Sequence, residues 1–122
     1  MCPFCWENFE KYHPKPVIFK TNKWLVTENA WPYELSKNHI LCVYKDHVEH
    51  TSKINEEGWK EIGEIIKKLE EERGIGYGTM LMRFGNVKNT GATVPHLHFQ
   101  LIQSDKDHKD YEPEKGLWTR IG

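Results

Sequence analysis

Long hydrophobic runs are absent from this sequence of 122 residues, and its formal net charge is only -1. A helix that spans a bilayer needs about 20 consecutive apolar residues, so we expect no membrane-embedded segment and no membrane partner. Residues 1–7 lack the basic start and the apolar stretch of a secretory signal, and we expect a cytoplasmic location. Surfaces that bind nucleic acid broadly are strongly basic, so the charge balance argues against nucleic acid as a partner.

Cysteine is scarce, and its odd count of three argues against a framework of paired disulfides. Cys42 lies in the apolar run at residues 40–43, where we expect a buried core thiol. Cys2 and Cys5 form a Cys-x-x-Cys pair at the spacing of a metal half-site or a redox pair. A reduced pair without metal is the alternative that this spacing leaves open.

The hydrophobic content of 38% and the charged content of 29% are ordinary for a globular protein. We expect one domain over residues 1–122, with a polar C-terminal tail at residues 104–122. Short apolar segments separated by turn residues indicate strands. The predicted strands cover residues 17–19, 24–27, 39–44, 79–84 and 95–102.

One clear helix is predicted between the third and fourth of these strands. Asn55 is a suitable N-cap, and Arg73 followed by Gly74 is typical of a helix C-terminus. The order of elements predicts an α+β fold, a mainly antiparallel five-stranded sheet with one main helix packed on one face. The apolar stripe expected to pack against the sheet consists of Trp59, Ile62, Ile65, Ile66 and Leu69.

The last predicted strand carries two histidines in the segment His96-Leu97-His98-Phe99-Gln100. Side chains alternate between the two faces of a strand. His96, His98 and Gln100 are therefore expected on one face, while Leu97 and Phe99 point toward the helix.

The loop before this strand, residues 89–94, is rich in small residues. Gly91 and Ala92 allow backbone N–H groups to approach an anion closely, and Thr93 adds a hydroxyl donor. Directly upstream of two histidines, this composition predicts a phosphate site beside a nucleophile. An ordinary turn followed by hydrogen-bonded histidines is the plain alternative.

Residues 91–102 as a whole resemble the signature of the histidine triad superfamily. Most members carry His-x-His-x-His, whereas the third position here is Gln100. That variant resembles the nucleotidyltransferase branches of the superfamily, galactose 1-phosphate uridylyltransferase and the diadenosine tetraphosphate phosphorylases. Residues 29–33, 39–41 and 45–47 are similar to the nucleoside-binding strands of the same superfamily.

The resemblance implies a role for each matching residue and a homodimer as the assembly. His98 would attack the α-phosphorus of a nucleotide and form a nucleotidyl-histidine intermediate, and Gln100 would bind phosphate oxygens. The other nucleotide-binding residues that the resemblance implies are Asn29 for the ribose and Asn86, Gly91, Ala92 and Thr93 for the phosphates.

Gln100 shapes the predicted reaction because glutamine offers only neutral hydrogen bonds and is neither an acid nor a base. A leaving group that needs little protonation is favoured, and anionic phosphate is favoured over water as the acceptor. We therefore predict a nucleotidyl transferase or phosphorylase acting on nucleotide phosphoanhydrides of the dinucleoside polyphosphate type, with a nucleotide or dinucleotide substrate and inorganic phosphate as acceptor.

Three alternatives stay open at this point. The first is a hydrolase that forms the same intermediate on His98 and transfers the nucleotide to water. The second is a zinc-stabilised nucleotide-binding module whose residual catalysis is incidental. The third is an enzyme in which His96 and His98 are ligands of a catalytic metal.

The resemblance, above all to the uridylyltransferase, also implies a structural zinc site. Cys2 and Cys5 would bind the metal together with His47 and His96, and His50 competes with His47 for this role. Such sites are tetrahedral and closed to further ligands. We expect His96 and His98 about 6–7 Å apart on one strand face, so that one binds metal while the other stays free for phosphorus.

Overall fold

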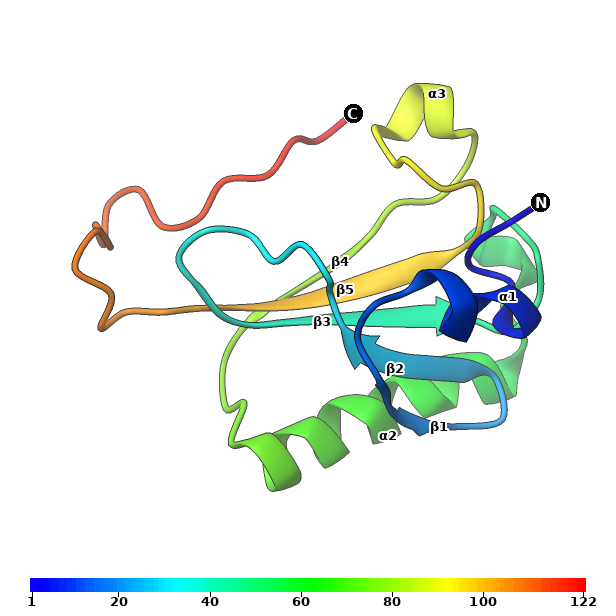
Figure 1. The fold of residues 1–122 in the computed structure, drawn as a ribbon, viewed down its shortest axis with the longest axis horizontal. Helices are drawn as coiled ribbons and strands as arrows, with labels where there is room; N and C mark the ends of the chain where they lie inside the picture. Colours follow the sequence, from blue (N-terminus) through cyan, green and yellow to red (C-terminus); the bar gives the residue numbers. More distant parts are fainter.

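A five-stranded sheet forms the centre of the structure, a computed structural model that describes residues 1–122 (Figure 1). The strand order is β1-β2-β3-β5-β4, and every neighbouring pair is antiparallel, which confirms the predicted α+β class. The strands cover Val17–Lys20 (β1), Trp24–Glu28 (β2), Ser36–Tyr44 (β3), Thr79–Met82 (β4) and His98–Ser104 (β5).

The central strands β3 and β5 differ from the prediction at their ends. β3 starts at Ser36, and its residues from His39 to Tyr44 are all buried, as expected for a strand covered on both faces. β5 begins at His98, so the predicted start at Pro95 is wrong. Pro95 has no N–H for a ladder hydrogen bond. The chain before β5 bonds instead to the loop after β3, where the Leu97 N–H donates to the Val48 carbonyl at 2.7 Å.

β4 is also shorter than predicted, because it ends at Met82 rather than at Phe84. Its neighbour β5 has no strand residue before His98, so a longer β4 would have no partner for its last ladder bonds. Phe84 is 58% exposed in the loop that follows.

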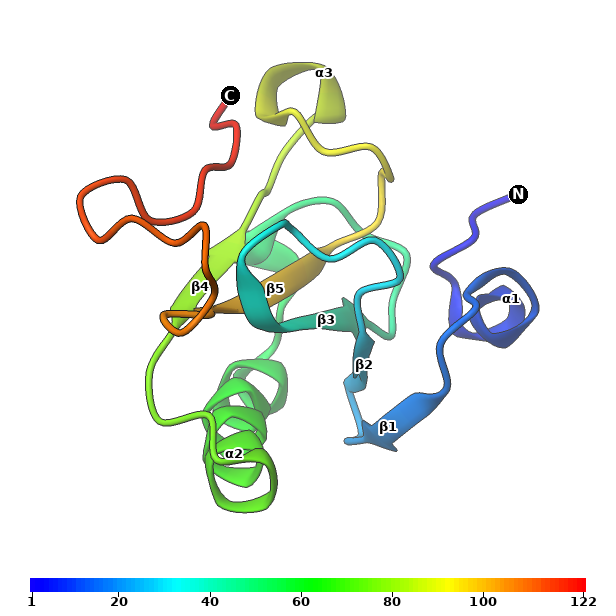
Figure 2. The same cartoon turned by 60° about the vertical axis from the view of Figure 1, so that its left-hand side comes forward.

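The helix α2 (Glu56–Arg73) covers one face of the sheet, as Figure 2 shows. The Asn55 side chain accepts a hydrogen bond from the Gly58 N–H at 2.8 Å, which confirms the predicted N-cap. Gly74 ends the helix at φ 65°, a left-handed conformation that favours glycine. Three residues of the predicted apolar stripe are buried in the main core together with Leu97, Phe99 and Leu101: Ile62, Ile65 and Leu69.

Trp59 does not join this core and is 49% exposed, so its predicted packing against the sheet is wrong. Successive residues of a helix are turned by about 100°, and the buried face of α2 is centred on Gly58, Ile62, Ile65 and Leu69. Trp59 lies at the side of that face.

Three short helical segments were not predicted: α1 (Trp6–Tyr12), η1 (Thr51–Lys53) and α3 (Val87–Thr90). α1 packs on the sheet face opposite α2, where Phe9 is buried against Leu25, Leu41 and Val43. α3 and the C-terminal tail lie over the same side of the sheet (Figure 2). No helix combines the length and the apolar character that crossing a membrane requires.

Candidate active site

His98 opens β5 and faces the side of the sheet that α2 leaves uncovered. Its Nδ1 donates to the His96 carbonyl at 2.7 Å, so in the neutral ring the proton is on Nδ1 and the lone pair is on Nε2. The Phe4 ring packs edge-on against the imidazole at a centroid distance of 5.0 Å. Burial lowers the pKa of His98, and the charges of His96 and Arg83 lower it further, while the bond to the carbonyl opposes them. The geometry therefore presents a neutral imidazole with a free nitrogen, as a nucleophile requires.

Gln100 has an amide group whose orientation is set by three neighbours. The Tyr33 N–H donates to His39 Nδ1 at 3.0 Å, so neutral His39 carries its proton on Nε2. That N–H donates to Gln100 Oε1, which also accepts from Asn29 Nδ2 at 3.3 Å. Because burial lowers the pKa of His39, this ring stays neutral. The Gln100 oxygen is thus occupied, and its NH₂ group is the part left to bind a ligand.

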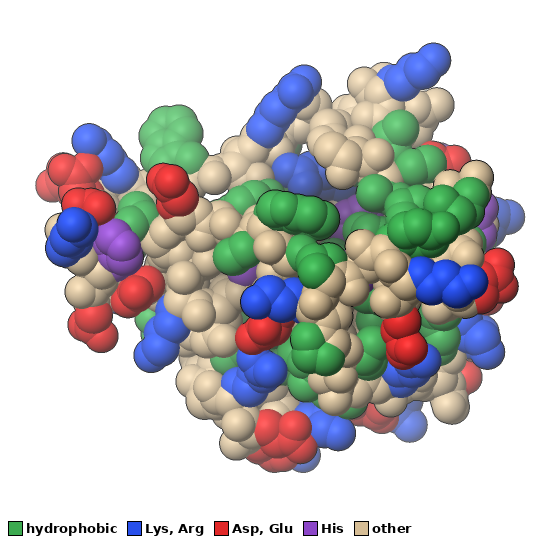
Figure 3. All heavy atoms as spheres, viewed as in Figure 1, with side chains coloured by type: hydrophobic (Ala, Val, Ile, Leu, Met, Phe, Trp, Pro, Cys, Tyr) green, Lys and Arg blue, Asp and Glu red, His purple; other side chains and the backbone are tan.

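A cavity of about 410 Å³ opens beside these two side chains. Figure 3 shows a hollow on this face of the molecule with histidine and basic side chains in it. The predicted residues that line the cavity together are Asn29, Gly91, Ala92, Thr93, His98 and Gln100. Asn86 does not line it: its side chain accepts from the Lys88 N–H at 2.9 Å and caps α3.

The small-residue loop uses part of its donors internally. Gly91 ends α3 at φ 78°, and its N–H donates to the Val87 carbonyl. The Ala92 N–H donates to Thr90 Oγ1 at 3.2 Å. The backbone N–H and hydroxyl of Thr93 have no protein partner, so Thr93 is the residue of this loop that offers free donors to the cavity.

The C-terminal tail closes the other side of the cavity, which the sequence did not reveal. Thr119 Oγ1 lies 2.9 Å from the Tyr33 hydroxyl and 3.3 Å from Arg83 Nη2. Arg83, Trp118, Thr119 and Tyr33 all line the cavity. A polar tail and a single arginine carry no periodic pattern, so only the folded contacts identify them.

A second cavity of about 420 Å³ lies next to the first and shares Tyr33, Trp118 and Thr119 as its wall. Tyr77 and Tyr111 add two further aromatic side chains to its lining. The site therefore has room for two large groups on either side of the shared wall.

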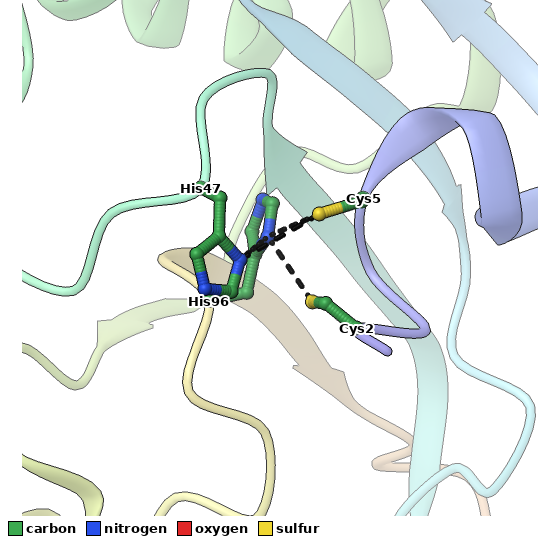
Figure 4. A group of neighbouring side chains, drawn as sticks. All are labelled: Cys2, Cys5, His47 and His96. Carbon is green, nitrogen blue, oxygen red and sulfur yellow. Dashed lines mark hydrogen bonds between the residues drawn. The ribbon is translucent and has the colours of Figure 1, made fainter.

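Figure 4 shows a cluster of two cysteines and two histidines, in which His96 stands two residues before His98 in the chain. The ligand atoms of Cys2, Cys5, His47 and His96 all lie within 4.8 Å of one another. His47 reaches the cluster from the loop after β3, and His50 lies outside it. The sequence left His47 and His50 as alternatives, and the structure brings His47 to the cysteines.

The distances within this cluster match a tetrahedral zinc site. Zinc–nitrogen and zinc–sulfur bonds of about 2.0 and 2.3 Å place two nitrogens about 3.3 Å apart and a nitrogen and a sulfur about 3.6 Å apart. The two Nδ1 atoms of His47 and His96 are 3.3 Å apart. Cys2 Sγ and Cys5 Sγ lie 3.4 and 3.8 Å from His96 Nδ1, and Cys5 Sγ lies 3.6 Å from His47 Nδ1. These residues fit the metal.

His96 is buried just before β5, not on the strand where the sequence placed it. Its Nε2 donates to the Tyr44 carbonyl at 2.6 Å, so in the neutral ring the lone pair is on Nδ1, which faces the cysteines. A hydrogen bond of this kind orients a histidine ligand toward its metal. His98 takes no part in the cluster, an arrangement that does not favour His96 and His98 as joint ligands of a catalytic metal.

Comparison with known proteins assigns the chain to a family. Residues 10–107 match the model of the HIT (histidine triad) domain, so the chain belongs to the histidine triad family. This match supports a nucleotide-binding function. No curated protein sequence matches it.

Three solved structures illustrate the likeness. A HIT-like protein shares 26% identity at a TM-score of 0.68, over 86% of this chain and 100% of its own. A HIT family hydrolase from Legionella pneumophila Philadelphia 1 shares 20% identity at a TM-score of 0.63, over 90% of this chain and 98% of its own. A zinc-bound histidine triad family protein from Mycobacterium smegmatis shares 18% identity at a TM-score of 0.63, over 92% and 83%.

Proposed function

We propose that this protein is a nucleotidyl transferase or phosphorylase that acts on nucleotide phosphoanhydrides through a nucleotidyl-histidine intermediate on His98. The observation that carries the proposal is the pairing of a neutral His98, with Nε2 free, and a Gln100 whose amide offers only N–H donors. A nucleophile is present, but no acid or base stands at the third position to protonate a leaving group or activate water.

The proposed reaction has two steps at phosphorus. His98 Nε2 attacks the α-phosphorus, the bond to the bridging oxygen breaks, and the leaving phosphate departs with the electron pair. An oxygen of inorganic phosphate then attacks the same phosphorus, and the phosphorus–nitrogen bond breaks to restore His98. Gln100 and Thr93 donate hydrogen bonds to the non-bridging oxygens. These hydrogen bonds strengthen as negative charge accumulates on the oxygens in the transition state.

The substrate class is a dinucleoside polyphosphate or a similar anhydride with two large ends. The two cavities of about 410 and 420 Å³ on either side of Tyr33, Trp118 and Thr119 support this choice, since pockets of about this size accept nucleoside-sized groups. Asn29 Oδ1 accepts from the Trp31 N–H at 2.8 Å and keeps a second lone pair for a ribose hydroxyl.

The acceptor is tested by isotope labelling. The purified protein is incubated with a dinucleoside polyphosphate and ¹⁸O-labelled inorganic phosphate. The products are then separated, and their masses are measured by mass spectrometry. We expect the label in a nucleoside diphosphate. Label from ¹⁸O-water in a nucleoside monophosphate, with none from phosphate, would contradict the transfer and support the hydrolase. Binding without turnover would support the binding module.

The cluster of Cys2, Cys5, His47 and His96 is proposed to hold one structural zinc ion. Its distances and the orientation of His96 support this assignment. The metal would supply no chemistry at phosphorus; it would cross-link the N-terminal segment and the loop after β3 to His96. The His96 carbonyl in turn orients the nucleophile.

A homodimer is proposed through the edge strand β4. β4 pairs only with β5, and Met80 on it is 50% exposed. An open edge with an apolar side chain favours two-fold pairing with a second copy. We expect Met80→Asp to convert a dimer into a monomer in sedimentation experiments, because a carboxylate would be buried at the pairing edge. Tyr12→Asp changes an exposed side chain of α1 and is the matched control, which should leave the dimer intact. Equal behaviour of the two variants would count against this interface.

A further inference from the structure

Arg83 and Arg120 are the two charged side chains that line the cavity with His98, and Arg83 is the one that directly follows a strand paired with β5. The register of β4 with β5 pairs Thr79 with Ile102 and Leu81 with Gln100. Met82 with Phe99 is the last pair of this ladder, and Arg83 is the residue that follows Met82 as His98 is the residue that precedes Phe99. Arg83 and His98 both line the cavity of about 410 Å³.

The guanidinium group of Arg83 is held in place but not neutralised. Its Nη2 donates to Thr119 Oγ1 and to the Arg120 carbonyl. No carboxylate forms a salt bridge with it. Its Nε is the only buried side-chain nitrogen or oxygen in the protein without a hydrogen-bond partner. A buried donor with no partner is costly, and an anion bound in the cavity with the substrate would offset the charge of this guanidinium group.

The chemistry of Gln100 indicates which anion would bind at Arg83. When His98 attacks, the electron pair of the breaking bond moves to the bridging oxygen, which becomes a terminal oxygen of the leaving phosphate. Gln100 cannot protonate this oxygen, because an amide N–H donates hydrogen bonds but is not an acid. The negative charge must therefore be met by a fixed cation, and arginine binds phosphate with several aligned donors.

We propose that Arg83 binds the leaving phosphate, stabilises the charge on its bridging oxygen, and so restricts this protein to substrates whose leaving group is an anionic phosphate. This inference rests on the proposed function for the direction of the reaction. No proton moves in the step: the nitrogen–phosphorus bond forms, the phosphorus–oxygen bond breaks, and Arg83 pairs with the oxygen that departs.

The first test compares two leaving groups. Adduct formation on His98 is timed by quenched-flow mass spectrometry with a dinucleoside polyphosphate and with a nucleoside 5′-p-nitrophenyl phosphate, whose leaving group spreads its own charge over a ring. Arg83→Gln should slow adduct formation from the dinucleoside polyphosphate by about 10²-fold and from the p-nitrophenyl phosphate by only a few-fold. The rate of Arg83→Lys should lie between the rates of wild type and Arg83→Gln. Equal slowing of both substrates, or of neither, would overturn the proposal.

The second test needs no turnover. Binding of inorganic pyrophosphate and of a nucleoside monophosphate is measured by calorimetry. Arg83→Gln should weaken pyrophosphate about tenfold or more and leave the monophosphate nearly unchanged. Unchanged pyrophosphate affinity would overturn the proposal even if wild-type protein forms the adduct. If the wild-type protein forms no adduct but binds pyrophosphate through Arg83, the result would support the anion site and contradict the proposed transferase function.

Controls for folding come from another arginine. Arg73 lies at the end of α2 and pairs with Glu28 at 3.0 Å on the surface. Arg73→Gln should match wild type in both tests. The thermal midpoint of Arg83→Gln should stay close to that of wild type, because the substitution removes the unpaired buried Nε together with the two hydrogen bonds of Nη2. A large loss of stability together with equal loss of both activities would indicate a purely structural role and overturn the proposal.

Discussion

Replacement of His98 by alanine is expected to lower kcat/KM by at least about 10³-fold and to abolish the nucleotidyl adduct, because His98 is the only imidazole that lines the cavity. The Nε2 of His98 is free and the ring is neutral. The measurement is intact-mass spectrometry of the protein after incubation with a dinucleoside polyphosphate, combined with steady-state rates.

The control for this prediction is His108→Ala, which removes a histidine of the C-terminal tail whose side chain is 38% exposed. It should leave both the adduct and the rate unchanged. Nucleotide affinity should stay within a few-fold of wild type in His98→Ala, since Gln100 and Thr93 still offer donors. An adduct of normal yield in His98→Ala would show that the nucleophile is elsewhere.

Removal of the proposed zinc ion is the second change with a large expected effect. At free zinc about 1,000-fold above its Kd, binding to the folded state alone adds about 4 kcal/mol to the free energy of unfolding. A chelator should therefore lower the thermal midpoint strongly, and metal analysis of protein purified without added zinc should give one ion per chain. Calorimetry in the presence and absence of chelator measures the shift.

Two neighbouring histidines supply the matched variants. His47→Ala removes a ligand of the cluster and should lose both the metal and the added stability. His50→Ala changes a residue three positions away that lies outside the cluster, and it should keep both. Loss of metal in His50→Ala with retention in His47→Ala would contradict the ligand set. Activity that persists in chelator, in protein that stays folded, would exclude a catalytic role for the metal.

The alternation rule predicted correctly from the sequence that His98 and Gln100 share one face of β5. Phe99 and Leu101 pack toward α2, so His98 and Gln100 face the cavity. The same rule failed for His96, because Pro95 interrupts the ladder and the strand begins only afterwards. A pattern with a period of two residues locates a face, but it does not say where pairing starts, since that depends on the partner strand.

Other parts of the site depend on contacts between distant segments. The donor-only character of Gln100 follows from His39, which reaches it through the pairing of β3 with β5. Arg83 and Thr119 meet only after the tail folds over the sheet. α1 spans seven residues, too few for a helical period to stand out, and its position is set by the burial of Phe9.

One residue joins the two sites of this molecule. The ring of His96 lies between the Tyr44 carbonyl and the cysteines, while its own carbonyl accepts from His98 Nδ1. If zinc binds there as proposed, metal binding and the orientation of His98 would be linked, and loss of the metal would disturb the position of His98 without removing any group that lines the cavity. Such a loss would appear as a slower first step at unchanged nucleotide affinity, and resupplied metal would reverse it.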